Sequence, residues 1–244
     1  MRAILLAAGR GRRLGIDEPK CLVPIAGKTL LERHLANMTG AGITSLTIVV
    51  GFQQAMIRDE LARLASPIPI ELFENPRFVH GSIVSLQVAS ERLLQGAIWM
   101  DADVFYPSAL LQRLVETKHD SSVLLDARSD ETGEEMMLGT LDGRVHQVAR
   151  RVGKTSPDGK SWDVVGEAVG FAKAGPKGGA VLKRILDAEV EAGRLDQEYE
   201  AAMNLAFGET VFGYERVDDF AWTEIDFPED VAKAEALAAG LSAS

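Results

Sequence analysis

The sequence predicts an α/β fold with a doubly wound, mostly parallel, Rossmann-like mixed sheet, followed by a C-terminal region that completes the sheet. Three observations support this prediction. Short apolar runs alternate with segments of helical spacing as far as residue 126. Such alternation is typical of right-handed βαβ crossovers between parallel strands. A glycine-rich turn follows the first apolar run, and the alternation gives way to a hairpin pattern after residue 126.

The first half of the chain contains five apolar runs of strand length. Arg2–Ala7 is too short for a helix, and the run at 46–50 is rich in β-branched residues and ends at Gly51. The other strands are predicted at 68–73, 97–100 and 122–126, and helices at 29–39, 55–64, 82–94 and 110–118.

The second half has a different pattern. The segments 136–141 and 144–148 flank Asp142-Gly143, a dipeptide typical of a tight hairpin turn. Glycine, serine, proline and lysine are concentrated at 153–161, which predicts a mobile loop. Further strands are predicted at 163–172 and 211–217, and helices at 177–192, 197–207 and 230–239.

Length and composition indicate a single globular domain, 1–244, made of the halves 1–126 and 127–244. The single cysteine, Cys21, excludes an intramolecular disulfide and fits the reducing cytoplasm. No stretch reaches the length of a membrane span. The net charge of -10 argues against a nucleic-acid partner. We therefore expect a cytoplasmic monomer or homodimer without a membrane partner.

Positive charge is nevertheless concentrated in the glycine-rich turn that contains Gly9, Gly11 and Arg13. Backbone N–H groups of such a turn can approach phosphates, and arginines add paired donors. The turn lacks both the Walker pattern and the third glycine of the dinucleotide fingerprint. Taken alone, it fits a phosphate site or a surface turn with solvated arginines.

A longer pattern favours the phosphate site. The stretch LAAGRGRRLGIDEPKCLVPIAGKTLLE (6–32) resembles the signature of the MobA-like nucleotidyltransferases that activate phosphorylated sugars and alcohols. The segments ENPRFVHGSIVSLQVASERL (74–93), MDADVFYP (100–107) and TEIDFPEDVAKAEAL (223–237) resemble the bacterial phosphocholine and aminoethylphosphonate cytidylyltransferase branch. The resemblance implies a fold of the nucleotidyltransferase type, with 1–126 binding the nucleotide and 127–244 binding the acceptor.

The resemblance also implies a reaction. A phosphate oxygen of the acceptor attacks the α-phosphorus of a nucleoside triphosphate, most readily CTP, and pyrophosphate leaves. Because both reactants are anions, charge neutralisation and positioning dominate catalysis. The acceptor phosphate is already ionised, so no general base is needed. By the same resemblance, Arg13 clamps the β- and γ-phosphates, and Lys20 bridges the α-phosphate and the acceptor.

Asp103 ends the fourth predicted strand, at the edge where open α/β sheets bind ligands. The resemblance assigns Asp103 and Asp226 as ligands of Mg²⁺, a hard cation that prefers oxygen donors. Asp101 is two residues before Asp103, and Glu224 is two residues before Asp226, so each shares a face with its neighbour in an extended segment. Each is therefore an alternative metal ligand or a partner that supports the ligand. The four histidines show no metal-ligand spacing.

The nucleotide is expected to contact the first strand and turn, the loop after the second strand, and the 74–86 region. A serine replaces an asparagine common in the family at position 82, so a uridine or thymidine nucleotide stays open. The predicted nucleotide contacts are Leu6, Ala7, Ala8, Gly9, Gly11, Arg13, Lys20, Gly51, Ser85 and Asp101.

The acceptor is expected to be a small phosphorylated alcohol or a phosphonate. Arg150 stands where the family commonly has a phosphate-binding lysine, a role that arginine can fill with two donors. Glu200 is a weaker candidate. A choline head group would need an aromatic box, for which Phe78, Tyr106, Trp162 and Trp222 are candidates. The predicted acceptor contacts are Arg150, Glu167, Asp126, Tyr106 and Trp222.

The sequence thus favours a magnesium-dependent cytidylyltransferase. Two alternatives stay open: a sugar-1-phosphate uridylyl- or thymidylyltransferase, and a nucleotide-binding regulatory protein without turnover. The joint presence of Arg13, Lys20, Asp103 and Asp226 favours an enzyme, because binding alone needs no acceptor-bridging lysine.

Overall fold

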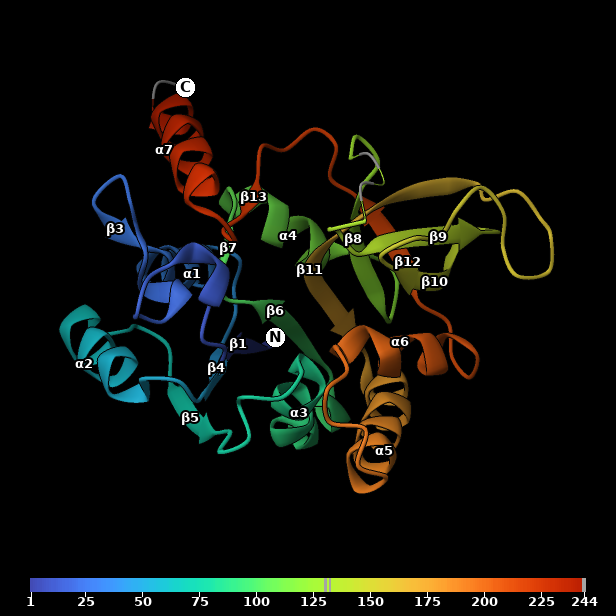
Figure 1. Ribbon diagram of the computed structural model, residues 1–244, viewed down its shortest axis with the longest axis horizontal. Coiled ribbons are helices and arrows are strands. Elements are labelled where there is room, and N and C mark those ends of the chain that lie inside the picture. The colour runs from blue at the N-terminus through green and yellow to red at the C-terminus, as the bar shows by residue number, and fades with distance from the viewer. Residues whose placement is uncertain (130, 132, 243–244) are drawn as a thin grey trace.

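In the computed structural model, which describes residues 1–129, 131 and 133–242, strands from both halves of the chain form one nine-stranded sheet (Figure 1). The order along its main path is β10-β9-β11-β6-β1-β4-β5, and β8 and β12 join through β11. The strands are β1 (Arg2–Ala7), β4 (Ser45–Val50), β5 (Ile70–Glu74), β6 (Ala97–Asp101), β8 (Ser122–Asp126), β9 (Met137–Leu141), β10 (Arg144–Ala149), β11 (Val164–Ala174) and β12 (Gly213–Arg216).

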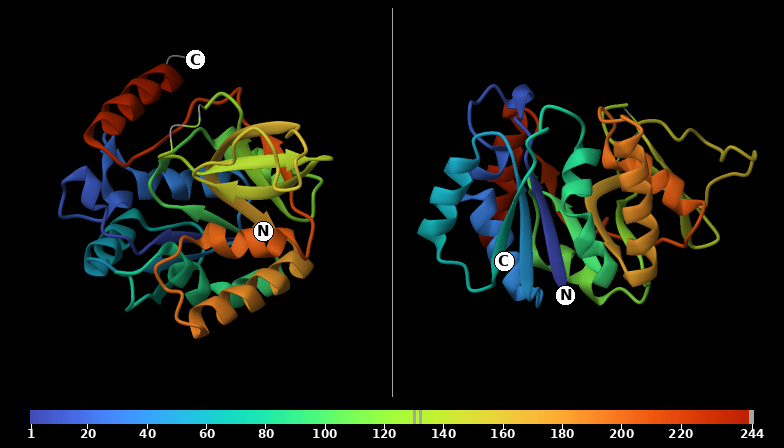
Figure 2. Two further views of the ribbon diagram at one scale, coloured as in Figure 1. Left: turned by 45° about the vertical axis from the view of Figure 1, so that its right-hand side comes forward. Right: turned by 90° about the horizontal axis from the view of Figure 1, so that it is seen from below.

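Helices cover both faces of this sheet, as a doubly wound fold requires (Figure 2). One face is packed by α1 (Leu30–Gly40), α2 (Gln54–Leu64) and α4 (Ser108–Glu116). The other is packed by α3 (Ser82–Val88), α5 (Pro176–Glu191) and α6 (Tyr199–Phe207). The predicted fold class is confirmed.

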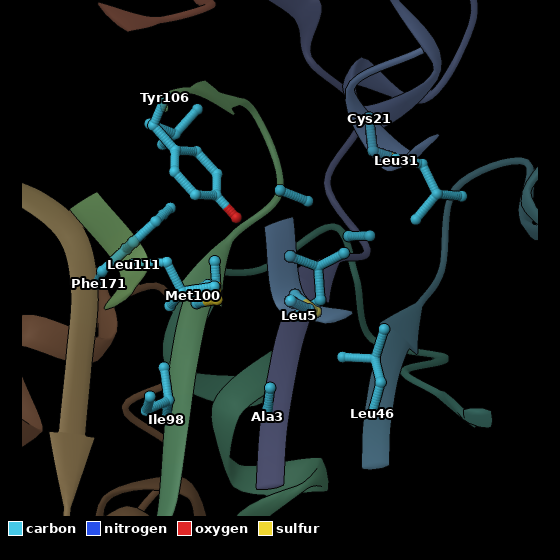
Figure 3. Close-up of a cluster of buried hydrophobic side chains, with 14 of the residues drawn as sticks. Ala3, Leu5, Cys21, Leu31, Leu46, Ile98, Met100, Tyr106, Leu111 and Phe171 are labelled. Carbon is cyan, nitrogen blue, oxygen red and sulfur yellow. The ribbon is translucent and has the colours of Figure 1, made fainter. Parts of the chain in front are cut away.

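Strand β1 contributes side chains to the apolar layers on both faces of the sheet, because successive side chains of a strand point to opposite faces. Ala3 and Leu5 pack with the helices of the first face (Figure 3). Ile4 packs instead with α3 and its neighbours. All three side chains are buried. A continuous apolar run suits this position, because β1 is covered on both faces and pairs in parallel with β4 and β6.

The sheet departs from a simple parallel order at β11. This long strand lies between β6 and β8 and is antiparallel to both, so β8 does not pair with β6. Gly170 interrupts the strand with a φ of 78°, a left-handed conformation that glycine adopts at low cost. The β11 pairing register also shifts between Ala168 and Ala172.

Two short ribbons complete the fold beside the sheet. One pairs β2 (Pro24–Ile25) with β3 (Lys28–Thr29), and the other pairs β7 (Val104–Phe105) with β13 (Thr223–Glu224). Phe105 and Ile225 are buried in a separate apolar cluster against α7 (Pro228–Ser242). The C-terminal helix therefore packs beside the N-terminal turn region, which also contributes Leu14 to this cluster.

The predicted helices and strands all occur, with shifted ends. The helix predicted at 82–94 is divided into α3 and a 3₁₀ segment at Ser90–Gln95. The loop at 153–161 contains no helix or named strand, but it has an isolated bridge between Thr155 and Ser161 and a hydrogen bond from the Ser156 N–H to the Lys160 carbonyl. No helix within the described residues combines the length and apolar character needed to cross a bilayer.

Candidate active site

A cavity of about 430 Å³ opens at the carboxyl ends of β1 and β6. This is the edge at which open α/β sheets bind ligands. Most of the predicted site residues line it: Leu6, Ala7, Ala8, Gly9, Gly11, Arg13, Lys20, Ser85, Asp101, Asp103, Arg150, Glu167 and Asp226. Residues that are distant in the sequence thus share one space.

The glycine-rich turn brings Lys20 into this cavity. Gly11 has a φ of 61°, and a Cβ at this position would lie 2.5 Å from Cγ of Lys20. Only glycine leaves room for the lysine stem to cross the turn. Leu14 closes the turn with a hydrogen bond from its N–H to the Gly11 carbonyl, 3.2 Å. The turn is therefore shaped around the lysine as well as open to a ligand.

Lys20 and Arg13 converge on two carboxylates. Nζ of Lys20 lies 2.8 Å from Oδ2 of Asp103 and also forms an ion pair with Asp226. Arg13 lies 2.7 Å from the other carboxylate oxygen of Asp226. Burial alone would lower the pKa of Lys20, but Asp103 and Asp226 outweigh it and raise that pKa above its usual range. The ammonium is therefore charged at every physiological pH.

The β7–β13 ribbon explains how Asp226 reaches Asp103. Glu224 pairs with Val104 in this ribbon. The next N–H group, that of Ile225, donates to the carbonyl of Asp103 at 2.8 Å. Burial of Ile225 in the cluster with α7 anchors the segment. Backbone pairing thus places two carboxylates from the C-terminal segment beside the one that follows β6.

Asp103, Glu224 and Asp226 form a compact group of oxygen donors. One carboxylate oxygen from each lies within 4.8 Å of the others. Glu224 is exposed and faces the cavity; partial desolvation of its carboxylate by the surrounding protein, together with the charges of Asp103 and Asp226, raises its pKa to about 8. Mutual repulsion of this kind is relieved when a cation binds between the carboxylates.

Asp101 is held by a contact that the sequence did not indicate. The hydroxyl of Tyr199 donates to Asp101 at 2.9 Å. A Cβ on Gly170 would collide with the same carboxylate, so the bend in β11 makes room for it. Burial raises the pKa of Asp101, and the nearby Asp103 and Glu200 carboxylates raise it further. Burial likewise raises the pKa of Glu200 to about 7.

Two serines of α3, Ser82 and Ser85, line the cavity. Ser85 is buried, and its Oγ accepts a hydrogen bond from the fully buried Asn75. Ser82 is occupied by other partners, because its hydroxyl donates to Glu198 at 2.6 Å and accepts from the N–H of Tyr199. Ser82 therefore joins α3 to the start of α6.

Gly51, predicted to contact the nucleotide, does not line the cavity. A Cβ there would lie 2.5 Å from Cβ of Phe78 and 2.9 Å from the carbonyl oxygen of Ala8. Gly51 instead lets Phe78 and the end of β1 approach closely, and both line the cavity. Its contribution to the site is indirect.

Two of the five predicted acceptor residues, Arg150 and Glu167, line the cavity. Arg150 donates to the backbone carbonyl of Glu134, and Glu167 accepts from the hydroxyl of Ser129. Burial raises the pKa of Glu167, and the carboxylate of Glu135 adds to this effect. A guanidinium and several carboxylates therefore lie together on the side of the cavity formed by the second half of the chain.

The other three predicted acceptor residues, Asp126, Tyr106 and Trp222, do not line the cavity. Asp126 is buried and accepts hydrogen bonds from Arg128 and from the indole of Trp222, the latter at 2.8 Å. Burial would raise the pKa of Asp126, but these donors lower it below its usual value. Both residues serve to hold the chain after β8 in place.

Tyr106 belongs to the hydrophobic core. Its ring packs edge-on against Phe171 with centroids 4.7 Å apart (Figure 3). Its hydroxyl lies 3.2 Å from Nδ1 of the buried His34. Tyr106 is therefore buried in the interior and does not line the cavity.

Comparison with known proteins places this site in a family. Residues 3–166 match the model of the MobA-like NTP transferase domain. The chain belongs to this nucleotidyltransferase family. The matched region includes the glycine-rich turn, Lys20, Asp103 and β6, so the predicted family is confirmed.

Among curated relatives of this MobA-like chain is CMP-5'-(3-aminopropyl)phosphonate synthase from Streptomyces rubellomurinus, 27% identical over 96% of this chain and 38% of that protein. Another is the bifunctional IPC transferase and DIPP synthase from Thermococcus kodakarensis, 26% identical over 96% of this chain and 49% of that protein. The chain thus spans less than half the length of either relative.

Solved structures show the same fold. CTP:phosphocholine cytidylyltransferase from Streptococcus pneumoniae matches with a TM-score of 0.77, at 20% identity, over 97% of this chain and 98% of that chain. The inositol-1-phosphate CTP transferase from T. maritima matches with a TM-score of 0.75, at 18% identity, over 97% and 95%. The nucleotidyltransferase type of fold is therefore shared along nearly the whole chain.

Proposed function

We propose that this chain is a cytidylyltransferase that transfers CMP from CTP to a small acceptor bearing a phosphate or phosphonate, with release of pyrophosphate. The carrying observation is the convergence of Arg13, Lys20, Asp103 and Asp226 in one cavity, with Lys20 2.8 Å from Asp103 and Arg13 2.7 Å from Asp226. Cytidylyl transfer is named in several of its relatives and structural neighbours.

The residues present fit a magnesium ion. Three carboxylates offer oxygen donors within 4.8 Å of one another. Two of them, Asp103 and Asp226, form ion pairs with the Lys20 ammonium, so this group of oxygens binds positive charge. Asp103 and Asp226, with Glu224 adjacent, would hold the ion. When bound, it supplies neutralisation of phosphate charge.

The protein's own contribution to the reaction is positioning and charge. An acceptor oxygen forms a bond to the α-phosphorus while the bond to the bridging oxygen of pyrophosphate breaks, and the leaving electrons go to pyrophosphate. Lys20 remains protonated, because its raised pKa prevents it from acting as a base. Lys20 and Arg13 therefore stabilise negative charge on the phosphates and on the departing pyrophosphate.

The cavity favours an acceptor with an amino group. Nine of its lining residues are carboxylates and three are arginine or lysine. Of the four aromatic residues considered for a choline box, only Phe78 lines it, so those four do not form the box that a quaternary ammonium would need. Charge pairing to carboxylates is available instead. We therefore assign an aminoalkyl phosphonate or phosphate ester as the acceptor class.

A matched panel tests the reaction and the acceptor class together. Pyrophosphate release is measured for CTP, UTP and dTTP, each with 3-aminopropylphosphonate, propylphosphonate, phosphocholine, inositol phosphate and glucose 1-phosphate. We expect CTP with 3-aminopropylphosphonate to give the highest kcat/KM, and propylphosphonate to lose at least tenfold because it lacks the ammonium. A preference for UTP or dTTP with glucose 1-phosphate would overturn the proposal.

A further inference from the structure

The hydroxyl of Ser85 has a hydrogen atom that no described residue accepts. Ser85 lies in α3, is 7% exposed and lines the cavity. Within the described part of the chain, its hydroxyl takes part in one hydrogen bond, as acceptor from Nδ2 of Asn75 at 3.0 Å. A serine hydroxyl is also a donor. A buried donor without an acceptor is costly, so this geometry favours a ligand that supplies one.

Asn75 is what fixes the direction of that hydroxyl. It follows β5 and is fully buried. Its Oδ1 accepts from the N–H of Arg77 at 2.9 Å, and its own N–H donates to the Val50 carbonyl at 2.8 Å. Because a backbone N–H requires an oxygen partner, the amide can face Ser85 only with its nitrogen. Ser85 must therefore accept from Asn75 and direct its hydrogen elsewhere.

The surroundings of Ser85 identify the chemistry of the missing acceptor. Ala8 and Phe78, which also line the cavity, both approach Gly51, and the residue that holds Ser85, Asn75, bonds to the adjacent Val50; the cations Arg13 and Lys20 come instead from the glycine-rich turn and the segment after it. A neutral donor held by the neutral, fully buried Asn75 suits a neutral carbonyl oxygen or ring nitrogen better than a phosphate.

We propose that Asn75 is a positioning residue for nucleotide recognition: it holds Ser85 so that the hydroxyl donates to an acceptor atom on the pyrimidine base, either O2 or N3. This inference rests on the proposed function only in taking a pyrimidine nucleotide as the ligand. At N3 the contact separates the two bases, because cytosine has an acceptor there and uracil a donor. At O2 it recognises both.

The test reverses the direction of the Ser85 hydroxyl by a substitution at Asn75 that keeps the shape of the residue 75 side chain. In Asn75→Asp, the carboxylate accepts from both Arg77 and Ser85, so lone pairs of Ser85 face the cavity. We expect a 10- to 100-fold rise in KM for CTP and in its Kd by calorimetry, with kcat changed less than threefold. Ser85→Ala should give a similar rise, and the double variant no further loss.

A matched control is Asn37→Asp. Asn37 donates from Nδ2 to the Tyr106 carbonyl at 3.1 Å and does not line the cavity. Its variant should keep the wild-type KM for CTP. Additive losses in the Asn75→Asp and Ser85→Ala pair, or a lower kcat at unchanged KM, would overturn the positioning role.

Base analogues test the inference even if the Asn75 variant does not fold. Binding of CTP, 2-thio-CTP and 3-deaza-CTP is compared in wild type and Ser85→Ala by calorimetry. We expect wild type to lose affinity for one analogue, and Ser85→Ala to bind that analogue and CTP equally. A loss for 2-thio-CTP identifies O2, and a loss for 3-deaza-CTP identifies N3.

The two proposals fail in different ways. If Ser85→Ala discriminates against both analogues as strongly as wild type does, the hydroxyl does not contact the base, whatever the enzyme transfers. If no acceptor is cytidylylated although Ser85→Ala abolishes the analogue discrimination, the proposed reaction fails and the base contact stands.

Discussion

At the residue scale, Lys20 is the side chain on which the proposed chemistry most directly depends. Its side chain is 14% exposed, and it is the cation between Asp103 and Asp226. Lys20→Ala removes positive charge beside the transferred phosphate. We expect kcat in the pyrophosphate-release assay to fall by about 10²-fold or more, with a smaller change in the Kd of CTP. The exposed Lys28 provides the control, because Lys28→Ala should keep the wild-type rate.

Glu200 leads to a prediction about stability and pH. Burial raises its folded-state pKa from 4.5 to about 7. Between these values the unfolded chain has released the proton and the folded chain still holds it, so rising pH disfavours the folded state, by at most a few kcal/mol. Glu200→Gln removes this penalty. Thermal unfolding should show a higher Tm than wild type at pH 8 and nearly the same Tm at pH 4.5.

Glu191→Gln is the control for this experiment, because it makes the same substitution at an exposed position of α5. Its Tm should follow that of wild type at each pH. A Tm difference for Glu200→Gln that does not change with pH would mean that packing, not ionisation, causes it.

Some residues were predictable from the sequence and others were not, for a physical reason. Arg13 and Lys20 lie in a contiguous motif, and the structure brings them to Asp103 and Asp226 as expected. Asn75 and Tyr199 act through buried partners that are distant in the sequence, Ser85 and Asp101. Residue type does not reveal such contacts, nor does it reveal that Tyr106 and Trp222 are buried outside the cavity.

At the element scale, the bend in β11 is predicted to hold Asp101 in place. Gly170→Ala would strain a φ of 78° and press a methyl group against the Asp101 carboxylate. Gly159 is the control: its φ is 85°, and a methyl group there would meet no described atom within 4 Å. Gly159→Ala therefore introduces the backbone strain without a side-chain collision. We expect each to lose about 1 kcal/mol from strain, and Gly170→Ala to lose more.

Chemical denaturation and CTP kinetics together check this prediction. Only Gly170→Ala should raise the KM for CTP, because only that variant displaces Asp101. Equal stability losses in the two variants, with unchanged KM, would show that the Asp101 contact is unimportant.

The elements themselves were predicted unevenly. Strand β1 was found because it is a short, continuous apolar run, and α1 because helical spacing persists over its eleven residues. The β7 and β13 strands have two residues each and too little periodicity to detect, yet they bring Asp226 to Asp103. The insertion of β11 between β6 and β8 is a long-range pairing, and local pattern carries no information about it.

At the scale of the whole molecule, the excess of negative charge opposes the binding of a triphosphate that carries no metal ion. The chain has a net charge of -10, and carboxylates outnumber cationic side chains around the cavity. Arg13 and Lys20 are already paired with Asp103 and Asp226. A nucleotide that arrives without a cation must therefore compete with carboxylates for the same positive groups.

This charge distribution predicts that CTP and Mg²⁺ stabilise the protein together far more than either does alone. At 100 times Kd, a ligand that binds only the folded state adds about 2.7 kcal/mol, which corresponds to a Tm rise of about 5–10 °C for a chain of this size. Thermal shift with CTP, MgCl₂, both, and both plus EDTA measures the effect. Asp103→Asn should abolish the synergy, whereas Asp59→Asn, on an exposed part of α2, should retain it. Full stabilisation by CTP in the presence of EDTA would instead mean that the protein's own cations suffice for the triphosphate.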